Sequence, residues 1–284
     1  GETVTVTLTS GIMMTTGYFT GPETWQFIAA AGDGPGAFDG GQNIISTTAE
    51  SAQSVYAIDI DNDGDLDILS ASYDTIAWYE NGNSWAKIDI TTTADGANSV
   101  FAADIDGDGD LDVLSAAYLG DKIAWYENEN AWTETVITTA ANGANSVFAA
   151  DIDNDGDLDV LSASMYDDTI AWYKNGNAWI KTDITTTADG ANSVFAADID
   201  GDGDMDVLSS SNTDDTVAWY ENGNSWAKTA ITTTANSANS VYAADVDGDG
   251  DLDVLSASYL DDKITWYENG NLWAGTTITT ATDG

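Results

Sequence analysis

Residues 54–73 read SVYAIDIDNDGDLDILSASY. This stretch returns four times in recognisable form, beginning at Ser99, Ser146, Ser193 and Ser240, with successive spacings of 45, 47, 47 and 47 residues. Each copy has two apolar segments rich in β-branched and aromatic residues, joined by an aspartate-rich loop. This pattern is typical of two β-strands connected by a turn. The regular spacing predicts a fold built from similar units placed side by side.

Each unit contains four segments of strand character. In the second unit they are SVFAADI (99–105), LDVLSAAY (111–118), KIAWYEN (122–128) and ETVITTA (134–140). Four short strands repeated in tandem with this period indicate the blades of a β-propeller, whereas β-solenoid repeats are shorter. The sequence therefore predicts an all-β fold, a β-propeller of four-stranded blades with five clear repeats over residues 51–284.

Residues 1–50 do not follow the repeat. The segments at 1–10, 11–19 and 23–30 can each be a strand, and QNIISTTAESAQ (42–53) aligns with the end of a blade. One interpretation is a divergent N-terminal blade, which would give six blades and is the one we favour. The other is a closing strand at 42–49 preceded by a separate arm at 1–41. Propellers with five or seven blades remain alternatives.

The loop DIDNDGDLD (59–67) places aspartates on alternate positions. Crowded carboxylates repel one another unless a cation neutralises them, and a hard dication such as Ca²⁺ takes six to eight oxygen ligands. The side chains at loop positions 1, 3, 5 and 9 and the backbone carbonyl at position 7 can supply these oxygens, and glycine at position 6 permits the sharp turn. We therefore expect about five Ca²⁺ ions per chain.

The candidate ligand residues occupy the same five loop positions in every unit. They are Asp59, Asp61, Asp63, Asp65 and Asp67; Asp104, Asp106, Asp108, Asp110 and Asp112; Asp151, Asp153, Asp155, Asp157 and Asp159; Asp198, Asp200, Asp202, Asp204 and Asp206; and Asp245, Asp247, Asp249, Asp251 and Asp253.

An EF-hand does not explain these loops. An EF-hand loop requires glutamate at position 12 and flanking helices. Position 12 is serine in all five units, for example Ser70, and the flanking segments have strand character. The predicted ligand set ends at position 9, inside a β-hairpin.

The stretch DVDGDGDLDVLSASYLDDKITWYENGN (245–271) resembles the FG-GAP/VCBS-type repeat of calcium-loaded propellers. Related repeats occur in integrin α-subunit heads, propeller lectins and secreted bacterial adhesins. The resemblance covers about residues 51–284, and its specific part is the D-x-D-x-D-G-x-x-D loop. It implies Ca²⁺ at positions 1, 3, 5 and 9, an extracellular or cell-surface location, and usually six or seven blades.

Composition excludes several functions. The chain has 49 acidic and six basic residues, a formal net charge of −43, and no histidine or cysteine. Such a surface offers no cationic patch for nucleic acid. No apolar run of 18 residues is present, so we expect no membrane insertion. Nearly every aspartate belongs to a repeated loop, whereas a catalytic site is normally one asymmetric constellation, so we do not expect an enzyme.

Two non-enzymatic functions remain. Tyrosines beside the variable loop after the second strand of a unit suit sugar binding, because an aromatic ring covers C–H groups while neighbouring polar groups meet hydroxyls. These candidate ligand-binding residues are Tyr73, Tyr118, Tyr166 and Tyr259. They favour a recognition or adhesion module with a glycan or cell-surface protein as partner. The alternative is a structural subunit of a surface layer or filament that self-assembles through its N-terminal arm.

Overall fold

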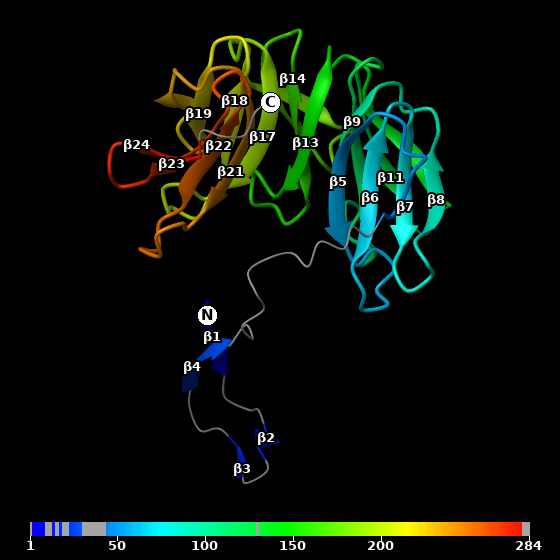
Figure 1. Cartoon of the computed structure of the whole chain (residues 1–284), viewed down its shortest axis with the longest axis horizontal. Coiled ribbons are helices and arrows are strands. Elements are labelled where there is room, and N and C mark those ends of the chain that lie inside the picture. The colour runs from blue at the N-terminus through cyan, green and yellow to red at the C-terminus, as the bar shows by residue number, and fades with distance from the viewer. Residues whose placement is uncertain are drawn as a thin grey trace. The chain divides into compact units, whose positions relative to one another are not determined.

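The computed structural model describes residues 2–8, 13–14, 17–18, 23–29, 44–128 and 131–279. The chain separates into two compact units, Gly1–Ile44 and Ile45–Gly284. The five repeats lie in the second unit, as four-stranded antiparallel sheets. Figure 1 shows these sheets following one another along the chain, from the blue and cyan blade one to the orange and red blade five.

Each sheet is a simple meander, in which consecutive strands are neighbours. Blade one contains β5 (Ala52–Ile58), β6 (Asp67–Ser72), β7 (Thr75–Glu80) and β8 (Ala86–Thr91). Blade two contains β9 (Ala97–Ala103), β10 (Asp112–Ala117), β11 (Lys122–Glu127) and β12 (Thr133–Thr138). Blade three contains β13 (Ala144–Ala150), β14 (Asp159–Ser164), β15 (Thr169–Lys174) and β16 (Ile180–Thr185).

The last two blades repeat this order. Blade four contains β17 (Ala191–Ala197), β18 (Asp206–Ser211), β19 (Thr216–Glu221) and β20 (Ala227–Thr232). Blade five contains β21 (Ala238–Ala244), β22 (Asp253–Ser258), β23 (Lys263–Glu268) and β24 (Ala274–Thr279). The described residues are thus all-β, and the β-propeller predicted from the sequence is confirmed.

The first unit contains two two-stranded antiparallel sheets. β1 (Glu2–Leu8) pairs antiparallel with β4 (Glu23–Ala29), and β2 (Met13–Met14) pairs with β3 (Gly17–Tyr18). Residues 44–51 of the chain form no strand. Much of the segment predicted to be a divergent blade or an arm, including residues 30–43, lies outside the described residues. Both interpretations, and the number of blades in the closed ring, stay predictions.

The hydrophobic core lies between the blades. Four apolar clusters are formed, and each joins the strands of two consecutive blades. In the cluster between blades one and two, Leu69 and Ile76 pack with Val100 and Val113. The apolar residues on both faces of each strand are therefore explained by burial against a blade on each side.

Apolar residues on the outer faces of the first and last blades are exposed, whereas their counterparts between blades are buried. Val55 is 70% exposed, whereas its counterparts in the other blades, for example Val147, are 4–5% exposed. Ile278 of blade five is 56% exposed, whereas Ile231 of blade four is 7% exposed. Within the described residues, no blade covers the first face of blade one or the last face of blade five.

The innermost strands surround a common axis. A cavity of about 450 Å³ is lined by an amide side chain and a serine from each of the five inner strands. The amides form a ladder, in which Asn98 Nδ2 donates to Asn145 Oδ1 (2.8 Å) and Asn145 Nδ2 donates to Asn192 Oδ1 (2.9 Å). Each inner strand also carries one aromatic ring, and the ring centroids of consecutive blades lie 4.7–5.0 Å apart. These residues are Tyr56, Phe101, Phe148, Phe195 and Tyr242.

A second asparagine connects neighbouring blades near the aspartate loops. Asn175 Nδ2 of blade three donates to the carbonyl of Ile105 in blade two (2.7 Å) and to that of Leu158 in its own blade (3.1 Å). Blades two, four and five repeat both bonds. Among the described residues, Asn81 of blade one makes only the bond within its blade, to Leu66 (3.1 Å).

This difference permits a matched test of the inter-blade hydrogen bond. Both substitutions remove the Nδ2 bond within the blade and the bond that the side-chain oxygen accepts from the next glycine amide, but only Asn175→Ala also leaves the Ile105 carbonyl without its partner. We expect Asn175→Ala to lower the free energy of unfolding by about 1–2 kcal/mol more, because an unsatisfied polar group near the core is costly. Denaturant unfolding of both variants under identical conditions measures the difference. Equal losses would contradict this role.

Candidate metal centre

The aspartate loop joins the first and second strands of every blade. Positions 4 and 6 of the loop have positive φ angles, as in Asn62 (58°) and Gly64 (99°) of the first loop. Position 4 is asparagine or glycine in all five loops and position 6 is always glycine, the residues that tolerate this backbone region best. The turn at position 6 was predicted from its glycine; the positive φ at position 4 was not predicted, although the restriction to asparagine and glycine is visible in the repeats.

The loop carboxylates fold the backbone around themselves. The amide of glycine at position 6 donates to the aspartate at position 1 in all five loops, at 3.0–3.2 Å. The amide at position 5 donates to the aspartate at position 3 in four of them, for example Asp63 N to Asp61 Oδ1 (3.2 Å). These bonds turn several carboxylates toward one centre.

Each loop brings three carboxylates together with one oxygen of each within 4.8 Å of the others. Positions 1, 3 and 9 meet in four loops: Asp59, Asp61 and Asp67; Asp151, Asp153 and Asp159; Asp198, Asp200 and Asp206; Asp245, Asp247 and Asp253. In the second loop the three are Asp104, Asp106 and Asp108, from positions 1, 3 and 5. Each repeat therefore has one carboxylate cluster that could hold a metal ion.

The other predicted ligands lie outside these clusters. At position 5 they are Asp63, Asp155, Asp202 and Asp249; at position 7 they are Asp65, Asp110, Asp157, Asp204 and Asp251; and at position 9 of the second loop it is Asp112. Their part in binding an ion stays a prediction.

The aspartate at position 9 differs from the rest because it is buried. Asp112 and Asp159 are 1% and 0% exposed, and each begins the second strand of its blade. The Asp159 carboxylate accepts bonds from the amides of Asn175 (2.8 Å) and Ile152 (3.2 Å). Burial raises the pKa of Asp112 to about 6, although its two backbone donors, Asn128 and Ile105, act in the opposite direction. Burial likewise raises the pKa of Asp159.

The donor set suits a hard cation. All side chains in the clusters are carboxylates, and carboxylate oxygen is the ligand type that Ca²⁺, Mg²⁺ and Mn²⁺ prefer. Soft and borderline metals favour cysteine or histidine, and the chain contains neither. The three carboxylates of a cluster repel one another at these distances, and a bound cation would offset that repulsion.

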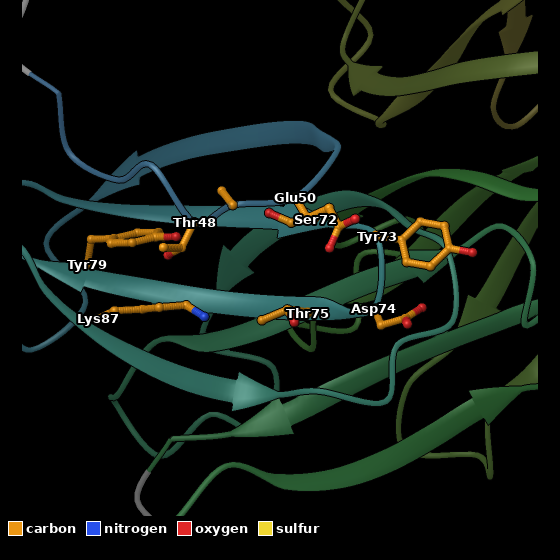
Figure 2. Close-up of a pocket in the computed structure, with 9 residues that line it drawn as sticks. Thr48, Glu50, Ser72, Tyr73, Asp74, Thr75, Tyr79 and Lys87 are labelled. Carbon is orange, nitrogen blue, oxygen red and sulfur yellow. The ribbon is translucent and has the colours of Figure 1, made fainter.

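The tyrosines predicted to bind a ligand lie at the edges of the blades. Tyr73, Tyr166 and Tyr259 are half-exposed, at 51%, 61% and 55%. A groove of about 260 Å³ between blades one and two is lined by Tyr73, Tyr118 and Leu119 together with Gln53, Asn98 and small residues. A second pocket, of about 180 Å³, is lined by Tyr73, Thr48, Glu50, Asp74 and Lys87 (Figure 2).

The four tyrosines are not equivalent. Tyr73, Tyr118 and Tyr259 directly follow the second strand of their blades, whereas Met165 holds this place in blade three and Tyr166 comes one residue later. The rings of Tyr118 and Tyr166 lie 5.3 Å apart, and their hydroxyl groups are hydrogen bonded. The edge between blades two and three is therefore occupied by a tyrosine pair, while the groove between blades one and two is open.

The repeats identify the family. The sequence profile of the FG-GAP-like repeat matches residues 18–70, 59–115, 104–162, 151–209 and 198–256. These matches cover most of the chain. The protein belongs to the FG-GAP-like repeat family. A search of curated protein sequences returned no match.

Solved structures share the fold of this FG-GAP-like repeat protein at low sequence identity. Virginiamycin B lyase from Staphylococcus aureus is 10% identical, with a TM-score of 0.60 and coverage of 83% of this chain and 73% of that chain. An Agrocybe aegerita lectin that recognises non-reducing terminal N-acetylglucosamine is 16% identical, with a TM-score of 0.54 and coverage of 82% and 67%.

An auxiliary nutrient-binding protein from Bacteroides ovatus is 12% identical to the chain, with a TM-score of 0.52 and coverage of 74% of this chain and 53% of that chain. At these identities the likeness concerns the fold alone, and the fold occurs in binding proteins and in a lyase. In the described part of the chain, no helix has the length and apolar character needed to cross a membrane.

Proposed function

We propose that this FG-GAP-like repeat protein is a calcium-stabilised, extracellular β-propeller that acts as a non-enzymatic recognition or adhesion module and binds glycans. The observation that supports the proposal most strongly is the carboxylate cluster present in each of five consecutive loops.

Calcium is the cation that fits the loops best. Ca²⁺ accepts irregular coordination by many oxygens, whereas Mg²⁺ demands near-ideal octahedral geometry and gives up its water reluctantly. The loops are short and exposed, and they offer carboxylates in slightly different combinations, as the second cluster shows. Such variation is tolerated by Ca²⁺ more readily than by Mg²⁺.

Calcium would contribute a large part of the stability. Sites in extracellular modules have dissociation constants of about 0.1–1 mM. With about 1 mM free Ca²⁺ and the tighter value, each site adds about 1.4 kcal/mol by mass action, and five sites of this affinity would add about 7 kcal/mol. This is comparable with the net stability of a typical domain, about 5–15 kcal/mol. Cytosolic Ca²⁺ would leave such sites empty, which supports an extracellular location.

Removal of calcium should therefore destabilise the fold. We expect excess EDTA to lower the melting temperature by about 15–30 °C relative to 1 mM Ca²⁺, since 1 kcal/mol corresponds to about 2–4 °C for a chain of this size. Mg²⁺ at the same concentration should restore little of the loss. Thermal melts followed by circular dichroism measure the effect, and an unchanged melt with EDTA would contradict the calcium assignment.

The open groove between blades one and two supports glycan binding. Tyr73 presents a half-exposed ring, and Gln53 and Asn98 place amide groups in the same groove. An aromatic surface with a few convergent polar groups is the usual composition of a small-molecule site. The same fold serves a lectin from Agrocybe aegerita, so the architecture is compatible with sugar recognition.

A non-enzymatic role follows from the distribution of the acidic residues. The described carboxylate clusters recur in register from blade to blade, and the chain lacks histidine, the usual proton-transfer group near neutral pH. A structural subunit of a surface layer or filament remains the alternative function, and a negative result in the glycan experiment would favour it.

The glycan proposal is tested on an array of immobilised glycans in millimolar calcium. We expect weak binding that Tyr73→Ala reduces by about tenfold or more, because the ring would supply much of the contact area. Tyr259→Ala is the matched control, since Tyr259 lies on the terminal blade and does not line the groove between blades one and two. Absence of binding to any glycan, or equal effects of the two substitutions, would contradict the assignment of this groove.

A further inference from the structure

One blade differs from the others at the end of its third strand. The last residue of this strand is Glu80, Glu127, Glu221 and Glu268 in blades one, two, four and five, but Lys174 in blade three. The position adjoins the aspartate loop of the same blade, so the exchange replaces a negative charge near the carboxylate cluster by a positive one.

Lys174 uses this position to contact two loop aspartates. Its Nζ forms ion pairs with Asp153 and with Asp155 Oδ2, the latter at 2.9 Å. These residues occupy loop positions 3 and 5, and Asp153 is a member of the carboxylate cluster.

The glutamates of the other blades act in the opposite direction. Glu80, Glu221 and Glu268 each accept a bond of 2.8 Å from an asparagine side chain three residues later. Each of these glutamates holds the strand position from which Lys174 reaches its loop, so each places a negative charge near its own carboxylate cluster. This charge adds to the field that attracts a cation.

We propose that Lys174 is a built-in counter-ion that makes the loop of blade three the weakest calcium site of the five. The proposal rests on the proposed function, because it assumes that the loops bind calcium. A calcium ion entering this loop must displace the ammonium group from Asp153 and Asp155. It also meets a local charge that is two units more positive than at the other sites, which at short range weakens binding by about tenfold or more even with the dielectric screening of water.

Calcium would then fill the chain in a fixed order. The four loops beside a glutamate load first, and the loop of blade three loads at higher concentration. When calcium is scarce, the ammonium group still offsets part of the repulsion between carboxylates in blade three. This blade packs against blades two and four, so the centre of the array loses the least stability when calcium is removed.

The five glycine amides at loop position 6 permit each site to be followed separately. Each of these amides donates to the position 1 aspartate of its own loop, so calcium binding in a loop should shift the NMR signal of its own glycine amide. The five glycines are Gly64, Gly109, Gly156, Gly203 and Gly250. Titration of the ¹⁵N-labelled chain with calcium, followed by NMR, therefore gives five separate binding curves. We expect Gly156 to respond at a calcium concentration about tenfold or more above the other four.

Two charge exchanges test the cause. Lys174→Glu should bring the Gly156 curve onto the others, and it should lower the melting temperature in EDTA because the counter-ion is lost. Glu221→Lys, in blade four, should shift the Gly203 curve to about tenfold higher calcium and leave Gly156 unchanged. The opposite effects of the two variants exclude a general change in stability.

The possible failures can be told apart. If no glycine of the wild-type chain responds to calcium, the proposed calcium function fails and this proposal with it. If all five respond together and Lys174→Glu changes no curve, calcium binding stands and the role of Lys174 is wrong.

Discussion

The fold depends on one buried aspartate in each blade, the residue at loop position 9. In blade three, Asp159 is fully buried and accepts hydrogen bonds from the loop amide of Ile152 and from the amide of Asn175. The side chain of Asn175 then donates to the Ile105 carbonyl of blade two. One carboxylate thus connects the loop, its own sheet and, through one asparagine, the neighbouring blade. A buried carboxylate destabilises the fold unless hydrogen bonds or a cation offset its charge. Loss of that compensation would therefore weaken the loop and the contact between blades together.

Repetition transmits this coupling along the chain. The cores lie between blades, and each blade is covered on both faces except at the two ends of the described array, where Val55 and Ile278 are exposed. Stability in such an array is close to a sum of units and of interfaces between neighbours. A cation bound in one loop would therefore stabilise mainly its own blade and the interface with the preceding blade, through the asparagine that follows the third strand.

Much of the fold and of the metal centre could be predicted because both are encoded locally. The period of the repeat determines the blades, and the alternation of aspartates with glycine at position 6 determines the turn that gathers the carboxylates. The contacts between blades could not be predicted, since nothing in the spacing of Asn175 indicates that it reaches Ile105, seventy residues earlier. The pairing of Tyr118 with Tyr166 and the contact of Lys174 with Asp153 likewise depend on the three-dimensional arrangement. Residues 1–50 lack the repeat, and the sequence left their arrangement open for that reason.

The most direct test is a crystal structure of the chain grown in calcium at a concentration that saturates all five loops, with anomalous scattering measured to locate the ions. The account predicts five calcium peaks, one per aspartate loop, each about 2.3–2.6 Å from carboxylate oxygens that include positions 1 and 3. Loops that stay free of calcium at saturating concentration, with their carboxylates directed into solvent, would contradict it.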